Sequence, residues 1–207
     1  MRLFERIVQF GIPRSGSTVV YNIVRELRPW ARVKKVHDLR GMDKRLPVIC
    51  TYRNPLDVMA SLFESQRLEA TAENLERQIV LLNLQGIWDI FLLKEHPHAL
   101  LLKYERFAGD LEWAVEQVAR FLDVPLPPAR RKDIVSRYDL SRIKQATDAL
   151  GDFSVVDKQT GFHGNHVSRF EGGSGYYRQV FSDEQVEELK RTFDFFLRYW
   201  GYATSRD

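Results

Sequence analysis

The residues best suited to chemistry lie near the start of the sequence, in the segment GIPRSGST from Gly11 to Thr18. Gly11 and Gly16 have the spacing of the glycines in a phosphate-binding loop, G-x-x-x-x-G-K-[ST]. Ser17 stands where that pattern has its lysine, and the cation of the segment is Arg14. A glycine loop between a strand and a helix surrounds an anion with backbone N–H groups and the positive helix end. The segment therefore predicts a site for a phosphate-like group.

A second segment, TYRNPLDVMASLF, repeats this arrangement later in the chain. An apolar run over 46–52 predicts a strand, Asn54 is a favourable helix N-cap, and Pro55 suits the first helical turn. Arg53 then stands at the end of the strand, and Ser61 lies two turns into the helix. One guanidinium and one hydroxyl at such a junction can hold a phosphate. The alternative, a surface arginine and a helix-face serine, stays open on these residues alone.

The pattern of apolar residues indicates the elements that position these two segments. Strands are predicted over 6–12, 32–37, 46–52 and 99–107; helices follow the first and third of them and are also predicted over 71–94, 109–125, 128–150 and 182–200. Alternating strands and helices predict an α/β fold of three layers, a mostly parallel sheet flanked by helices with a P-loop-like nucleotide-binding topology. Ligands of such sheets bind at the carboxyl ends of the strands.

The length of 207 residues predicts one domain, 1–207, with a mobile loop over 151–181. This loop is rich in Gly, His and Ser and lacks periodicity, which is typical of functional or mobile segments. His163 and His166 lie in it without a further Cys/His cluster, so they predict a polar loop and no metal site. We expect the loop to fold over the bound ligands and to exclude water.

Composition excludes several classes of protein. Cys50 is the single cysteine, which excludes an internal disulfide and a zinc cluster and favours a reducing compartment. No segment has the length of a membrane span and the first residues lack signal-peptide regions, so we expect a cytoplasmic protein. A net charge of +3 is too small to indicate nucleic-acid binding. The basic clusters ARVKK, MDKRL and PARRKD are solvated faces or the rim of a site for an anion. The sequence does not predict the oligomeric state.

Two other classes of function compete for the opening loop. A magnesium-dependent kinase or NTPase needs a lysine on the phosphates and an acidic residue at a strand end. Ser17 removes the lysine, and Glu105 is the one acidic candidate, because the strands end in CTYR and LLLKYE. A non-catalytic nucleotide-binding domain is the third possibility.

Together, GIPRSGST and TYRNPLDVMASLF resemble the two cofactor motifs of the sulfotransferases that use 3'-phosphoadenosine 5'-phosphosulfate (PAPS). The resemblance implies that Arg53 and Ser61 bind the 3'-phosphate. It extends to LLLKYERF and FLDVP, which implies that Tyr104 lies near the adenine. It also implies that the first loop holds the 5'-phosphosulfate, through Arg14, Ser15, Gly16, Ser17 and Thr18.

The chain departs from the cytosolic members of this family in three places, the first being Arg14, where many of them have lysine. Val19 stands where the cytosolic enzymes have an adenine-stacking tryptophan, so another aromatic residue must stack or adenine binding is looser. In the C-terminal segment HVSRFEGGSGYYRQVFSDEQ, Phe170 and Glu171 replace the expected Arg-Lys pair. Arg169 or Arg178 is then the substitute for the second contact to the 3'-phosphate, and the sequence does not choose between them.

Sulfuryl transfer requires charge stabilisation on the leaving phosphate and a base for the acceptor proton, and it requires no metal. Arg14 suits the first task, because a guanidinium can contact two oxygens at once. His37 ends the strand-like segment RVKKVH at the carboxyl edge of the sheet, matching the family's catalytic histidine in K-T-H, and Lys35 is its partner toward the sulfuryl group.

The identity of the base stays open between this histidine and a glutamate, Glu26 or Glu64. His37 can also be a polar loop residue beside Asp38. The acceptor is expected to carry a hydroxyl or an amine, on a small molecule or a glycan. The basic clusters leave room for an anionic glycan, and the aromatic content leaves room for a phenol or a lipid.

Overall fold

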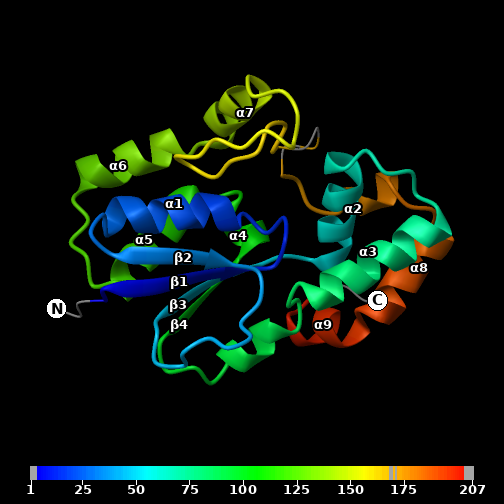
Figure 1. The fold of residues 1–207 in the computed structure, drawn as a ribbon, viewed down its shortest axis with the longest axis horizontal. Coiled ribbons are helices and arrows are strands. Elements are labelled where there is room, and N and C mark those ends of the chain that lie inside the picture. Colours follow the sequence, from blue (N-terminus) through cyan, green and yellow to red (C-terminus); the bar gives the residue numbers. More distant parts are fainter. Residues whose placement is uncertain (1–3, 168–169, 171, 203–207) are drawn as a thin grey trace.

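A parallel sheet forms the centre of the molecule (Figure 1). The computed structural model describes residues 4–167, 170 and 172–202. Within this part the sheet has four strands in the order β2-β1-β3-β4, and each neighbouring pair is parallel. The strands are β1 (Arg6–Gly11), β2 (Arg32–Val36), β3 (Val48–Tyr52) and β4 (Ala99–Lys103). The predicted α/β fold with a parallel sheet is therefore confirmed.

Helices cover both faces of the sheet. They are α1 (Ser17–Leu27), α2 (Pro55–Ser65), α3 (Ala72–Leu84), α4 (Tyr104–Phe107), α5 (Leu111–Phe121), α6 (Pro128–Arg137), α7 (Leu140–Asp148), α8 (Asp183–Thr192) and α9 (Asp194–Tyr199), with two 3-10 helices, η1 (Asp89–Leu93) and η2 (Tyr176–Gln179). The apolar sides of α1 and α5 pack on one face of the sheet. Side chains of α2, α3, α8 and α9 join the cluster on the other face.

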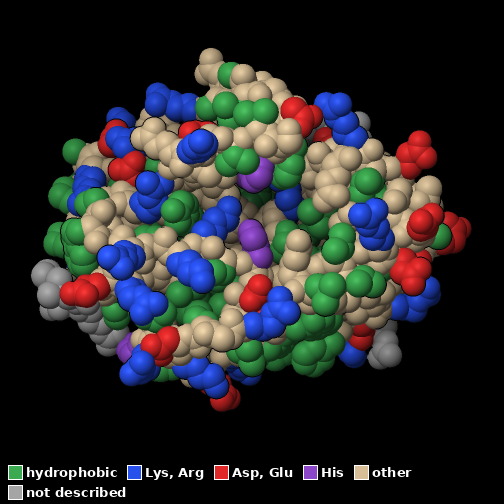
Figure 2. Space-filling view, in the orientation of Figure 1, with side chains coloured by type: hydrophobic (Ala, Val, Ile, Leu, Met, Phe, Trp, Pro, Cys, Tyr) green, Lys and Arg blue, Asp and Glu red, His purple; other side chains and the backbone are tan. Residues whose placement is uncertain are grey.

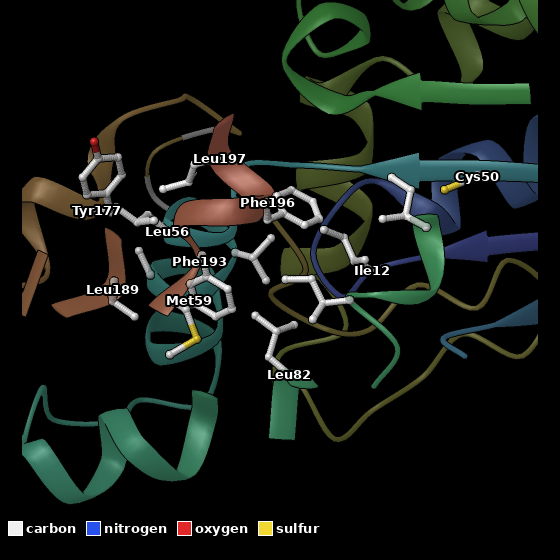
Figure 3. Packing of buried hydrophobic residues seen from close by; sticks show 14 of the residues in the cluster. Ile12, Cys50, Leu56, Met59, Leu82, Tyr177, Leu189, Phe193, Phe196 and Leu197 are labelled. Carbon is white, nitrogen blue, oxygen red and sulfur yellow. The ribbon is translucent and has the colours of Figure 1, made fainter. Parts of the chain in front are cut away.

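The second of these clusters fixes the position of α2, which carries part of the site. Met59 of α2, Leu82 of α3 and Phe193 and Phe196 of the C-terminal helices are each 0% exposed. Figure 3 shows these side chains pointing into one apolar cluster, close to Ile12 at the start of the opening loop. The close packing of these buried side chains holds the ends of β1 and β3 against α2.

The helix predicted over 71–94 is confirmed over Ala72–Leu84 (α3) but is too long, because the chain turns at Gly86. Gly86 has a φ of 73°, in the left-handed region that favours glycine. A Cβ at this position would lie 2.6 Å from the carbonyl oxygen of His37. The close approach lets Asp89, at the start of η1, accept a hydrogen bond from the Leu39 N–H at 2.7 Å. The break thus supports the turn that follows His37.

Two further boundaries differ from the sequence prediction. The strand predicted over 99–107 ends at Lys103, and α4 begins at Tyr104. The helix predicted over 182–200 is divided at Phe193 into α8 and α9. The capping box predicted for it is confirmed, since Ser182 and Gln185 exchange side-chain and backbone hydrogen bonds.

The segment over 151–181 has little regular structure in its described residues, as its composition predicts. It contains an isolated bridge between Val156 and His163 and the short helix η2. In Figure 1 it runs from α7 across the start of α1 toward α2. No helix among the described residues is long and apolar enough to cross a membrane.

Candidate functional site

The site lies at the carboxyl edge of the sheet, where β1, β2 and β3 end beside α2 and the segment 151–181. Figure 2 shows a hollow on this side of the molecule in which histidine and basic side chains gather. This is the edge at which ligands of parallel α/β sheets bind. The two sequence segments GIPRSGST and TYRNPLDVMASLF both pass this edge, the first after β1 and the second after β3.

The first loop has the backbone of an anion-binding turn. Gly16 is the N-cap of α1 with a φ of 75°, and no side chain caps this helix end. A Cβ on Gly16 would lie 2.7 Å from Cζ of Phe107, so the ring of α4 packs directly under the loop. Arg14 also has a positive φ, 61°. The first turn of α1 contains no acidic residue, so its N–H groups and positive end remain available to an anion.

The three hydroxyl residues of the loop differ in position. Ser15 Oγ donates to the carbonyl oxygen of Ile12 at 2.6 Å and lies 2.8 Å from Thr51 Oγ1. Its side chain therefore braces the loop against β3 and does not face the site. Ser17 and Thr18 lie in the first turn of α1, and Thr18 Oγ1 accepts a hydrogen bond from Lys35 Nζ at 2.6 Å. The loop is thus joined to β2 by the lysine that the resemblance singled out.

Arg53 lies at the second junction and is 3% exposed. It donates to the carbonyl oxygens of Arg14 at 3.2 Å and of Gly173 at 2.8 Å. Its guanidinium carbon lies 4.3 Å from the ring centroid of Tyr104 and 5.6 Å from that of Tyr176. Its Nε has no hydrogen-bond partner although it is buried. This donor, which has no partner among the described residues, is free to bind an anion or a water molecule.

The two junctions meet in one cavity. Arg14 Nε donates to Ser61 Oγ at 2.8 Å, and Arg14 Nη2 donates to the carbonyl oxygen of His166 at 2.8 Å. The cavity has a volume of about 70 Å³ and is lined by Arg14, Gly16, Val19, Arg53, Ser61, Tyr104, His166 and Gly172, among others. The structure thus brings the predicted 5' and 3' contacts together, and Tyr104 with them.

The cavity is smaller than the roughly 300–1,000 Å³ of a typical ligand site. His166 and Gly172 close it from the segment 151–181, and the carbonyl groups of His166 and Gly173 occupy donors of Arg14 and Arg53. A larger ligand can enter only when these contacts are broken.

Arg178, one of the two candidate substitutes for the C-terminal Arg-Lys pair, does not line the cavity. Arg178 is exposed and its guanidinium carbon lies 5.3 Å from the ring centroid of Tyr177. The other candidate, Arg169, lies outside the described residues. Tyr104 and Val19 both line the cavity.

Burial and neighbouring positive charges lower the pKa values of the basic groups of the site. Burial lowers the pKa of Arg14, with a smaller contribution from Arg53. Burial and the charge of Arg14 lower the pKa of Lys35 to about 8. Burial, Arg14 and Lys35 lower the pKa of His166 to about 3, so this histidine is neutral. Arg14 and Arg53 thus bring positive charge to one place, with the Glu64 carboxylate near Arg14 as a partial counter-charge, and this favours an anionic ligand.

His37 has the tautomer that a general base requires. Its Nδ1 lies 2.6 Å from the carbonyl oxygen of Gly11, which can only accept, so Nδ1 carries the proton and Nε2 keeps its lone pair. Loss of water around the ring lowers the pKa of His37 below its ordinary value of 6.5, and Lys35 lowers it further. His37 is therefore unprotonated at neutral pH.

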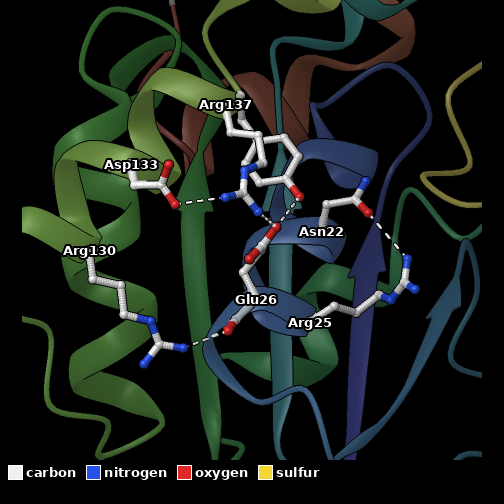
Figure 4. A network of polar contacts seen from close by, with 7 residues as sticks. Asn22, Arg25, Glu26, Arg130, Asp133 and Arg137 are labelled. Atoms are coloured by element: carbon white, nitrogen blue, oxygen red, sulfur yellow. Dashed lines mark hydrogen bonds and ion pairs between the residues drawn. The ribbon is translucent and has the colours of Figure 1, made fainter.

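Of the two glutamates, Glu26 lies far from this chemistry. Figure 4 shows its carboxylate beside the guanidinium of Arg137. The carboxylate also accepts a hydrogen bond from the hydroxyl of Tyr138 at 3.1 Å. It belongs to the last turns of α1, away from the loop, so its use as a base is ruled out in this conformation. Glu64 in contrast lies near Arg14 and raises its pKa.

Two acidic residues that sequence analysis did not assign to the site hold the second junction. Asp57 is buried and both its carboxylate oxygens accept from the Gly175 N–H, at 3.0 and 2.9 Å. Glu105 accepts from the Asn54 N–H at 2.8 Å and from the Tyr202 hydroxyl at 2.9 Å. Glu105 is therefore used to hold α2, which removes the single candidate for a magnesium ligand at a strand end. Their partners lie more than 50 residues away along the chain, so no local signal reveals these roles.

Comparison with known families agrees with this geometry. The model of the sulfotransferase domain family matches residues 35–201, most of the chain, and the chain therefore belongs to this family of PAPS-dependent enzymes. The match begins after the opening loop, so the assignment of the family does not depend on GIPRSGST. No curated protein sequence matches the chain.

Solved structures show the same fold. Mouse sulfotransferase SULT7A1, complexed with PAP, has a TM-score of 0.70 and 16% sequence identity, over 95% of this chain and 86% of that one. Retinol dehydratase with androsterone and the inactive cofactor PAP has a TM-score of 0.70 and 14% identity, over 95% of this chain and 82% of that one. At such identities the likeness shows the fold, while the site rests on the residues described above.

Proposed function

We propose that the protein transfers a sulfuryl group from PAPS to a hydroxyl or amine of a small-molecule or glycan acceptor. The observation that carries the proposal is the meeting of two anion-binding junctions in one cavity, with Arg14 hydrogen-bonded to Ser61. A nucleotide with phosphates at both its 5' and 3' positions is the ligand that uses both junctions. The buried, unsatisfied Nε of Arg53 and the glycine cradle at Gly16 fit such a group.

In this proposal each group of the cavity has one task. Arg53 and Ser61 hold the 3'-phosphate, and Tyr104 lies beside the adenine. Gly16, Ser17 and Thr18 surround the 5'-phosphosulfate with backbone and hydroxyl donors. Ser15 shapes the loop through Thr51. Arg178 has no contact in the cavity of this conformation and would need the segment 151–181 to rearrange before it could reach the 3'-phosphate.

The donor, when bound, supplies a sulfuryl group attached to a phosphate leaving group. The acceptor oxygen or nitrogen forms a bond to sulfur while the bond from sulfur to the 5'-phosphate oxygen breaks. His37 Nε2 takes the acceptor proton, because Nδ1 is held by Gly11. Arg14 and Lys35 stabilise the negative charge that develops on the leaving phosphate. Lys35, with its pKa near 8, is largely charged at neutral pH.

The decisive experiment is calorimetric binding of adenosine 3',5'-bisphosphate (PAP), compared with AMP and with ATP plus magnesium. We expect the wild type to prefer the bisphosphate, and Arg53→Ala to lose that preference while it still binds AMP. Arg45→Ala serves as the matched control, because Arg45 is an exposed arginine paired with Asp43. Preference for ATP with magnesium would refute the proposal and favour a kinase or NTPase. Tight PAP binding without turnover on any acceptor would favour a non-catalytic domain.

A further inference from the structure

A second cavity adjoins the first and shares Arg14 with it. Its volume is about 320 Å³, within the range of small-ligand sites, and its walls come from the end of α2, from α7 and from the segment 151–167. Arg14 lines both cavities, and its guanidinium lies 5.5 Å from the ring centroid of Phe153 in the second. The group that faces the leaving phosphate in the proposed function is therefore also a wall of this cavity.

Backbone conformation sets this cavity apart from the rest of the molecule. Four non-glycine residues in the described part of the chain have a positive φ, and three of them line it: Arg14 at 61°, Arg67 at 53° and Asn165 at 47°. For arginine this conformation costs free energy, and such residues cluster at functional sites. Arg67 follows the C-terminal end of α2, where the chain turns away from the helix, and it lines the mouth of the cavity.

The charges of the lining balance. Among the described residues it contains three cationic ones, Arg14, Arg67 and Lys144, and three acidic ones, Glu64, Asp148 and Asp152. Lys144 and Asp148 form an ion pair at 2.8 Å. In the described part of the chain, the apolar side chains of the lining are Phe153 and Val167, and Phe153 is stacked on His163 with ring centroids 4.5 Å apart. The cavity therefore offers many hydrogen-bonding groups beside apolar surface of nearly equal extent.

We infer that this cavity binds the acceptor and that the acceptor is a small polyhydroxylated molecule without net charge, a neutral sugar unit. A phenol or a lipid would bury the charged lining without hydrogen bonds to replace its water. A uronic acid or another anionic sugar would gain no net electrostatic attraction, because the three carboxylates of the lining offset its three cations. Several hydroxyls can instead bond to carboxylates and guanidinium groups together. The inference rests on the proposed function and narrows its acceptor.

The test measures transfer of labelled sulfate from PAPS to three sets of acceptors. These are methyl glycosides of glucose, galactose, mannose and N-acetylglucosamine; glucuronic and galacturonic acids; and 4-nitrophenol and 2-naphthol. We expect the highest kcat/KM for one of the neutral glycosides. A higher value for a phenol or a uronic acid, or no transfer to any neutral glycoside by protein that binds PAP, would overturn the inference.

Two variants test the place of binding. Ser65→Trp fills the wall of the cavity and Arg67→Ala removes a group at its mouth, so each should raise the acceptor KM about tenfold or more with kcat reduced less than threefold. The controls are Glu69→Trp, an exposed position four residues after Ser65, and Arg45→Ala at the opposite edge of the sheet. Circular dichroism and thermal unfolding establish that each variant is folded.

Measuring PAP binding distinguishes a failure of the acceptor site from a failure of the proposed function. Ser65→Trp should bind PAP with the wild-type Kd, because Ser65 does not line the first cavity. An unchanged acceptor KM in a folded Ser65→Trp protein would overturn this acceptor site and leave the proposed function intact. Failure of the wild type to bind PAP would refute the proposed function itself, and the acceptor inference with it.

Discussion

The two strand-to-helix junctions have the same topology and opposite electrostatics. At the first, α1 begins at Gly16 without a side-chain cap and without an acidic residue in its first turn. At the second, Asn54 caps α2 by accepting from the Leu56 N–H at 3.0 Å, and the buried carboxylate of Asp57 lies in the first turn. The first helix end is left open to an anion, and the second is already satisfied within the protein.

This difference divides the work of binding between backbone and side chains. The open end of α1 offers N–H groups and a partial positive charge, which suit the 5' group. The closed end of α2 offers neither, so a 3'-phosphate there depends on the Arg53 guanidinium and the Ser61 hydroxyl. Four predictions test this contrast, and they are ordered by the size of the expected effect.

The largest effect is expected for Arg14→Ala, which removes the side chain that connects the two junctions. Loss of a donor aimed at transition-state charge lowers the rate roughly 10²–10³-fold. The measurement is kcat for sulfate transfer, with circular dichroism as the control for folding. Ser61→Ala, which removes only the partner of Arg14 Nε, should affect PAP binding more than kcat. A folded Arg14→Ala protein with a wild-type rate would contradict the role of this residue.

Gly16→Ala should close the first junction. The positive φ costs about 1–3 kcal/mol for alanine, and the new Cβ would lie 2.7 Å from Cζ of Phe107. Gly41→Ala is the control, because Gly41 has a φ of 68° and no atom within 4 Å of an added Cβ. Both variants lose stability in thermal unfolding, and only Gly16→Ala should lose PAP affinity, by tenfold or more. Equal affinities in the two variants would show that the loop backbone does not hold the anion.

The pH dependence of kcat/KM reports the free enzyme and should be bell-shaped. His37 acts as a base when neutral, and its pKa is lowered, so the acid limb falls below pH 6.5. Lys35 acts when charged, and its pKa is about 8, so activity falls above about pH 8. Lys35→Arg should remove the alkaline limb, because arginine stays charged. An alkaline limb that persists in this variant would exclude Lys35 as its source.

The pH profile of kcat gives a second test of Lys35. A bound phosphosulfate places negative charge beside Lys35, and opposite charge raises the pKa of a lysine. The alkaline limb of kcat should therefore lie at higher pH than that of kcat/KM. Equal positions of the two limbs would indicate that Lys35 does not contact the bound donor.

The first junction was predictable from sequence in more detail than the second. Gly11, Arg14 and Gly16 lie within six residues of sequence, and their roles depend on local backbone geometry, which residue types and spacing determine. The strands β1 and β3 were predictable for the same reason, since their apolar runs are short and bounded. The closure of the second junction comes from Glu105 and Gly175, which no local pattern connects to Asn54 or Asp57.

The errors of the sequence prediction have a similar origin. The helix over 71–94 has a suitable periodicity, yet the close approach of the His37 carbonyl requires a turn at Gly86. Glu26 is near the opening loop in sequence, but ten residues of helix carry it to the other end of α1. The second cavity was not predictable at all, because its walls come from α2, α7 and the segment 151–167.

The smallest effect is expected for Asn54→Ala, which removes the cap of α2. Loss of a side-chain N-cap costs about 1 kcal/mol of stability, through the Leu56 N–H that loses its partner. Ser182→Ala is the matched control, because it removes the cap of α8, far from the cavity. The two variants should unfold at similarly lowered temperatures, and both should keep the wild-type Kd for PAP.

Unchanged affinity is the informative result for Asn54→Ala, since it separates the two junctions most directly. If the backbone at the start of α2 took part in binding the 3'-phosphate, opening this helix end would change the Kd for PAP but not for AMP. The buried carboxylate of Asp57 opposes such a role, because it lies in the first turn and accepts from Gly175. A selective change in PAP affinity would show that both helix ends bind phosphate. An unchanged Kd would confine the 3' contact to the side chains of Arg53 and Ser61.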